Sequence, residues 1–166
     1  MKLMNTHGIT QFDTANGLGI GTVLWVSGCE HHCLNCHNPQ TWDRKSGRYF
    51  DHTGKDLDFL LKTLEPDYIS RLTISGGDPL HPFNRWTVGF ILNAVKQVHP
   101  EVKTWLYTGY EWEQAKDIIK PFAYALDYLV DGRFIESLKD LNLPYRGSSN
   151  QHIIDVKTGN IVDFSK

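Results

Sequence analysis

The sequence predicts an α/β fold in which a mainly parallel sheet forms an incomplete, open barrel. Short β-rich apolar runs alternate with stretches of helical periodicity, which is the pattern of consecutive βαβ units. A closed eight-stranded barrel of this kind typically needs about 250 residues, and this chain has 166. Since we find no linker, repeat or low-complexity tract, we expect one domain over residues 1–166.

Four apolar runs are the predicted strands of the βαβ part, and each ends at a turn motif. In chain order they cover residues 20–27, 71–75, 102–108 and 125–130, followed by the motifs SGC, SGGDP, YTGY and VDG. Functional groups of parallel sheets gather at the carboxyl ends of the strands. We therefore expect these motifs to meet at one rim of the open barrel.

Three helices are predicted between or after these strands. Leu57, Leu60, Leu61 and Leu64 are spaced as one helix face, and apolar residues from Val88 to Val98 form a second stripe. Asn84 is the expected N-cap of that second helix. The stretch EWEQAKDII predicts a short third helix that stops before Pro121, and residues 151–166 predict a C-terminal hairpin turning at Thr158-Gly159-Asn160.

Composition and charge exclude several classes of function. The net charge is −2 with scattered Lys and Arg, so we expect no nucleic-acid partner. No apolar run approaches the roughly 18 residues of a membrane span, and the N-terminus lacks the apolar core of a signal peptide. The three cysteines are too close together for a secreted disulfide framework, which favours the reducing cytoplasm.

The cysteines Cys29, Cys33 and Cys36 have the spacing C-x3-C-x2-C within a loop that follows the first predicted strand. Thiolates prefer soft metals, so two kinds of metal centre compete. A structural zinc would need a fourth ligand, for which His31, His32 and His37 are candidates. An iron–sulfur cube held by three cysteines would leave one iron without a protein ligand, open to a substrate.

The sequence resembles the radical S-adenosylmethionine (SAM) enzymes in this cysteine spacing. CHNPQTWD resembles the cluster loop of the glycyl-radical-enzyme activases, and SGGDP resembles their SAM-binding glycine motif. YTGY, VDGRF, RGSSNQ and the small size are similar to those activases that act on anaerobic ribonucleotide reductase. This resemblance extends from Phe12 to about Ile154, and it implies an open (β/α) barrel of the radical SAM type.

This resemblance implies an oxidoreductase with two cofactors, a [4Fe–4S] cluster and SAM. Cys29, Cys33 and Cys36 would ligate three irons, and the fourth iron would chelate SAM. Reductive cleavage of SAM would give a 5′-deoxyadenosyl radical that generates a glycyl radical on the partner. The implied partners are the large subunit of an anaerobic ribonucleoside-triphosphate reductase and an electron donor such as flavodoxin. The cofactors carry the chemistry, so no side chain is expected to be catalytic in itself.

The resemblance also implies a SAM-binding set of residues. Gly76 and Gly77 would let the backbone approach SAM closely, and Asp78 would orient its ammonium group. The backbone at Asn35, Cys36 and His37 would pass near the adenine, although many members of that family have an apolar residue where this chain has Asn35. Thr108 is expected to face the same cavity and to donate its hydroxyl to SAM.

Several residues keep two interpretations. Arg146 is either a carboxylate clamp or a docking residue, and Ser148, Ser149 and Asn150 form either a functional segment or a capping turn. Trp105 is expected in the core, and His31 and His32 are expected to face solvent. Two alternatives for the whole protein stay open, another glycyl-radical-enzyme activase, such as that of pyruvate formate-lyase, and a non-catalytic interaction module stabilised by zinc.

Overall fold

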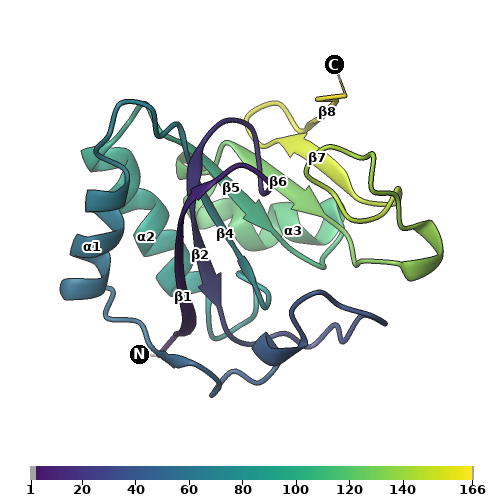
Figure 1. Ribbon diagram of the computed structural model, residues 1–166, viewed down its shortest axis with the longest axis horizontal. Helices are drawn as coiled ribbons and strands as arrows, with labels where there is room; N and C mark the ends of the chain where they lie inside the picture. The colour runs from purple at the N-terminus through teal and green to yellow at the C-terminus, as the bar shows by residue number, and fades with distance from the viewer. Residues whose placement is uncertain (1–2, 166) are drawn as a thin grey trace.

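A single mixed sheet organises the computed structural model, which describes residues 3–165 (Figure 1). Over those residues the sheet has eight strands in the order β3-β1-β2-β4-β5-β6-β7-β8, so β3 and β8 form its two edges. The strands are β1 (Asn5–Asp13), β2 (Gly21–Val26), β3 (Arg48–Tyr49), β4 (Arg71–Gly76), β5 (Lys103–Tyr107), β6 (Tyr128–Asp131), β7 (His152–Asp155) and β8 (Asn160–Val162). The open α/β architecture is confirmed, while its assignment to the radical SAM barrel type stays a prediction.

The parallel centre of the sheet consists of the four strands predicted from the apolar runs. β2, β4, β5 and β6 pair in parallel in that order, and their carboxyl ends lie along one rim. The predicted C-terminal hairpin is also confirmed, because β7 pairs antiparallel with both β6 and β8.

Two antiparallel strands on the other side of β2 were not expected. β1 pairs with β2, and the two-residue β3 pairs with β1. The segment of β1, NTHGITQFD, is mostly polar with a single buried residue, and bulges interrupt its register against β2. It therefore lacks the apolar alternation by which a strand is recognised in a sequence.

Three helices pack on one face of the sheet within the described part of the chain (Figure 1). They are α1 (Lys55–Thr63), α2 (Arg85–Val98) and α3 (Trp112–Ile119), and short 3₁₀ helices cover Pro39–Thr41, Lys120–Ala125 and Glu136–Leu138. The main core lies between helices and sheet and includes Leu72, Ile74 and Ile91. Asn84 does precede α2, but its side chain does not cap the helix. It donates instead to the carbonyl oxygens of Ser27 (2.8 Å) and Asp78 (2.9 Å).

A second, smaller apolar cluster fills the opposite face of the sheet. Its buried members are Trp105, Val130 and Ile153, which confirms the core position expected for Trp105. Tyr107 and Phe164 pack against this cluster, and the Tyr107 hydroxyl donates to the carbonyl of Tyr145 (2.6 Å). The sheet is therefore covered on both faces, as parallel strands require.

Arg71 at the start of β4 fixes the loop between β1 and β2. The buried guanidinium donates to the carbonyl oxygens of Asp13 (2.8 Å), Asn16 (3.0 Å) and Leu18 (3.3 Å), and to the Asp13 carboxylate (2.8 Å). Burial opposes ionisation of Asp13, but hydrogen bonds from the Asn16 N–H and from Arg71 outweigh it and lower the pKa of this carboxyl. The loop thereby closes the end of the sheet opposite to the motif-bearing rim.

Across residues 3–165, no helix combines the length and the apolar character that crossing a membrane would need.

We expect Arg71→Met to destabilise the fold by about 3–5 kcal/mol, because it leaves a carboxylate and several carbonyl groups without their buried partner. Urea unfolding of the apoprotein measures this. The matched control is Arg48→Met, because Arg48 also pairs with a carboxylate (Asp56, 2.8 Å) but is 58% exposed. Water can reach the place of the exposed Arg48 guanidinium, whereas Arg71 is fully buried, so the loss should be smaller in Arg48→Met. Equal losses in the two variants would contradict the role given to Arg71.

Candidate functional site

The three cysteines lie in a loop, residues 27–43, that leaves β2 at the motif-bearing rim; we call it the cysteine loop. All three line one cavity of about 150 Å³. Every predicted site residue except Asn35 lies in its wall, and these residues are Cys29, Cys33, Cys36, His37, Gly76, Gly77, Asp78 and Thr108. The rim therefore brings together the motifs that follow β2, β4, β5 and β6, as the sequence predicted.

Backbone N–H groups lie near the sulfur atoms. The Asn38 N–H donates to the Cys36 sulfur (3.4 Å). The N–H groups of His31 and His32 act to lower the pKa of the Cys29 thiol, and that of Phe134 acts to lower the pKa of Cys33. Such N–H groups stabilise the negative charge of cluster-ligating thiolates. Three partly buried thiols at one cavity, each beside a backbone N–H group, fit the requirements of an iron–sulfur cluster.

Burial makes two of the free thiols, Cys29 and Cys33, weaker acids. It raises the pKa of Cys29 to about 11, with a further contribution from the Asp78 charge, against the effect of the His31 N–H. Burial likewise raises the pKa of Cys33, against the N–H of Phe134. Bound iron would have to displace these protons, because thiolates are the ligating form.

A single metal ion has no comparable site in the described structure. Among residues 3–165, no three or more side chains of His, Cys, Asp or Glu are grouped so that they could hold one ion. This finding concerns single ions, since the thiolates of a cube bind separate irons.

The cysteine loop contains three residues with left-handed backbone, Gly28 (φ 103°), His32 (φ 50°) and Asn35 (φ 55°). Asn tolerates this conformation better than most residues. At Asn35 it accompanies the tight turn in which the Cys36 N–H donates to the Cys33 carbonyl (3.1 Å). The exposed Asn35 thus has a conformational reason to precede the third cysteine, and its place near an adenine stays a prediction.

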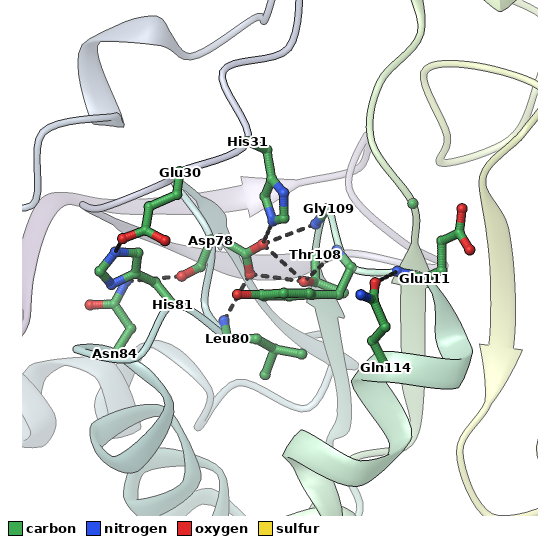
Figure 2. A network of polar contacts seen from close by, with 12 residues as sticks. Glu30, His31, Asp78, Leu80, His81, Asn84, Thr108, Gly109, Glu111 and Gln114 are labelled. Atoms are coloured by element: carbon green, nitrogen blue, oxygen red, sulfur yellow. Dashed lines mark hydrogen bonds and ion pairs between the residues drawn. The ribbon is translucent and has the colours of Figure 1, made fainter.

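The Asp78 carboxylate joins three segments at the rim (Figure 2). Its side chain is 2% exposed, and it accepts hydrogen bonds from His31 Nε2 (2.6 Å), the Thr108 hydroxyl (2.9 Å) and the Gly109 N–H (3.0 Å). The Leu80 N–H also donates to it, at 2.8 Å. One buried carboxylate thus ties the cysteine loop to the ends of β4 and β5.

This network gives Asp78 and Thr108 structural partners beside the predicted SAM contacts. The hydroxyl hydrogen of Thr108 is used by Asp78, and the Thr108 oxygen accepts from the Tyr110 N–H (3.2 Å). Both oxygens of the Asp78 carboxylate have at least two donors. Contact of either residue with SAM remains a prediction.

The space around the two glycines of SGGDP is already filled by backbone. A Cβ on Gly77 would lie 2.6 Å from the carbonyl oxygen of Gly28, and one on Gly76 would lie 2.7 Å from that of Val26. Gly76 also has a positive φ of 109°. The absence of side chains is thus required by contact with the strand and loop that carry Cys29, and not only by an approaching cofactor as we had expected.

The expected solvent exposure of the loop histidines is wrong for His31. Its side chain is 8% exposed and lies against Asp78 and the edge of Tyr110 (4.9 Å between ring centroids). His32 is exposed and stacks on Trp42 (4.5 Å), and the exposed His37 lies beside Phe134 (5.1 Å). Sequence reasoning missed His31 because its partner Asp78 is 47 residues away.

The segment RGSSNQ binds the connection between β6 and the 3₁₀ helix Glu136–Leu138, which runs past Cys33. Gln151 accepts from the N–H groups of Gly147 (2.9 Å) and Ser148 (3.1 Å) and donates to the Gly132 carbonyl (3.0 Å). The Ser148 hydroxyl accepts from the Ile135 N–H (3.2 Å). These bonds favour the turn-forming interpretation of the serines. They also give the VDGRF motif a site role that the sequence did not reveal, presentation of the Phe134 N–H.

Comparison with known proteins agrees with this site. The family model for 4Fe–4S single cluster domains matches residues 15–154. A relative from Vibrio cholerae is 39% identical over 152 residues, covering 90% of this chain and 97% of the relative. One from Enterobacteria phage T4 is 38% identical over 150 residues (90% and 93%), and one from Escherichia coli strain K12 is 36% identical over 150 residues (89% and 96%). All three are named anaerobic ribonucleoside-triphosphate reductase-activating protein.

The chain belongs to this family. The resemblance inferred from the motifs is thereby confirmed, and membership of the activating-protein family also supports the iron–sulfur interpretation of the three cysteines through the 4Fe–4S domain.

We expect Gly77→Val to lower the iron content of the reconstituted protein, because the added side chain would displace the backbone of Gly28 next to Cys29. Iron analysis after anaerobic reconstitution measures this, with circular dichroism to confirm folding. Ser75→Ala is the control, since Ser75 lines the same cavity and the change only removes a hydroxyl. Full iron loading of Gly77→Val would show that the loop can move aside.

Proposed function

We propose that this protein is a radical SAM activase of anaerobic ribonucleoside-triphosphate reductase. A [4Fe–4S] cluster bound here would supply the electron that cleaves SAM to methionine and a 5′-deoxyadenosyl radical, which removes a hydrogen atom from a backbone glycine of the reductase. The observation that carries the proposal is the convergence of three thiols, the SGGDP turn and the β5 terminus on one cavity. An external electron donor, such as flavodoxin, is required for the reduction.

The cluster would be held by Cys29, Cys33 and Cys36, and three thiolates for four irons would leave one iron for SAM. The N–H groups aimed at the sulfurs would stabilise the charge of the thiolates. Burial of the site would restrict water around the reacting groups.

SAM is larger than the space beside the cysteines alone, and the structure offers room next to it. A second cavity of about 390 Å³ shares His37, Ser75, Tyr107 and Phe134 with the cysteine cavity. Aromatic side chains and polar groups, including Asn38 and Gln151, line both cavities. This combination suits a ligand with an adenine ring and hydrogen-bonding groups.

The reductase is the proposed partner because relatives of nearly the same length carry its name. A glycine in the backbone of another protein can be reached only if the cavity is open to that protein. The open sheet satisfies this requirement, because the strand order of residues 3–165 does not close into a barrel around the cysteine loop. The docked reductase would then complete the wall that excludes water.

The decisive experiment is anaerobic mixing of the reconstituted protein with reductase, SAM and a one-electron reductant. Electron paramagnetic resonance should detect a glycyl radical on the reductase, and chromatography should detect 5′-deoxyadenosine and methionine. Brown protein with about four irons per chain is expected beforehand. Colourless protein with stoichiometric zinc would instead favour the interaction module.

Cys29→Ala, Cys33→Ala and Cys36→Ala should each abolish SAM cleavage, because a cube would keep thiolates at only two irons. His37→Ala is the matched control in the same loop, and it should keep its iron because the exposed His37 has no ligand role in this proposal. Iron content and 5′-deoxyadenosine formation measure both effects. Full turnover in any of the cysteine variants would remove that cysteine from the ligand set.

A further inference from the structure

Asp78 holds the chain on both sides of Cys29. Its backbone N–H donates to the carbonyl of Gly28 (2.7 Å), directly before the cysteine. Its carboxylate accepts from the Nε2 of His31 (2.6 Å), two residues after the cysteine. Figure 2 shows the imidazole of His31 pointing down onto this carboxylate. Cys29 is thus the middle of a segment whose two ends are bonded to one residue.

The imidazole of His31 fits closely against Asp78, Gly109 and Tyr110, and we call this binding place the His31 seat. A Cβ on Gly109 would collide with the ring, so the seat exists only because this position is glycine. The edge of Tyr110 closes it on another side. Since Asp78 also accepts from Thr108 and Gly109, the seat is fixed to the ends of two strands and not to another flexible loop.

Because the His31 side chain is held in one orientation, the backbone of His31 and His32 next to Cys29 is held as well. The N–H groups of His31 and His32 lie near the Cys29 sulfur and act to lower the pKa of its thiol. His32 has a positive φ of 50°, a conformation that the surrounding structure must maintain. Release of the imidazole would free this turn and let both N–H groups move away from the sulfur.

We propose that His31 is a positioning residue that sets the reduction potential of the cluster through these N–H donors. The inference rests on the proposed function, since it requires a cluster bound by Cys29. Hydrogen bonds to ligating sulfurs stabilise the reduced cluster, which carries one more negative charge, and so raise its potential. Loss of the seat therefore makes the cluster harder to reduce without removing a ligand.

The neighbouring residue provides a matched control. Glu30 precedes His31 in the cysteine loop, and its Oε1 lies 3.3 Å from His81 Nε2. The Glu30 side chain is 76% exposed. Exposed pairs of this kind contribute little, so Glu30→Gln should leave the potential unchanged. His31→Leu removes the donor, whereas His31→Gln keeps an N–H that can reach Asp78.

The test is a potentiometric titration of the reconstituted proteins, followed by electron paramagnetic resonance without SAM or reductase. At a fixed solution potential, His31→Leu should lower the ratio of reduced to oxidised cluster about tenfold. This corresponds to a fall of about 59 mV in the reduction potential of a one-electron couple. His31→Gln should recover most of this loss. Hydrogen exchange on the apoproteins provides a second measurement, in which the amides of residues 31 and 32 should exchange faster in His31→Leu than in wild type.

The outcomes separate this role from the proposed function. Equal potentials in wild type and His31→Leu, or equal amide exchange, would overturn the positioning role even if the glycyl radical forms. A wild-type protein that takes up no iron would count against the proposed function, and the exchange measurement would still decide whether His31 orders the loop. If His31→Leu does not fold, as judged by circular dichroism, Gly109→Ala takes its place, because the added Cβ would displace the His31 ring. A potential and an amide exchange equal to those of wild type in Gly109→Ala would then overturn the role.

Discussion

The buried carboxylate of Asp78 is the constraint on which the functional rim depends. It lies at the end of β4 and accepts hydrogen bonds from the cysteine loop, from the β5 terminus and from its own turn. A buried carboxylate is costly unless it is fully paired. Each of these segments must therefore hold its donor in place. Pairing with the one Asp78 carboxylate thus fixes the positions of three otherwise irregular segments relative to one another.

At each end of the sheet one buried charged side chain fixes the neighbouring loops, and the two charges have opposite signs. At the rim a buried anion, Asp78, collects N–H and O–H donors, whereas at the other end a buried cation, Arg71, collects carbonyl oxygens from the β1–β2 loop. Both residues lie on the same strand, β4, at its start and just beyond its end. The central strand thus organises the loops at both ends, while the apolar clusters on its two faces hold the sheet itself.

The regular part of the fold was predictable because its signals are local. The apolar runs of β2, β4, β5 and β6 and the leucine spacing of α1 are visible within short windows. β1 was missed because its exposed, polar sequence is ordered by pairing with β2, an interaction between strands rather than a local pattern. The three cysteines were found by their spacing, and the SGGDP turn by its resemblance to a family motif. The seat of His31 and the Phe134 N–H were not, because they arise from contacts between segments far apart in the chain.

The edges of the sheet have a consequence for partner recognition. β3 covers β1 at Asn5 and Thr6, next to the end of β2 from which the cysteine loop leaves, and the opposite edge strand β8 has three residues. Neither edge therefore presents a long row of unpaired backbone groups beside the cysteine loop. Short edges resist unwanted association between sheets, but they also deny a visiting protein the template for β-augmentation. A reductase segment that approaches the cysteine loop would then be recognised by side chains and loop geometry. Its specificity would be encoded in the rim and would change through substitutions there, without alteration of the sheet.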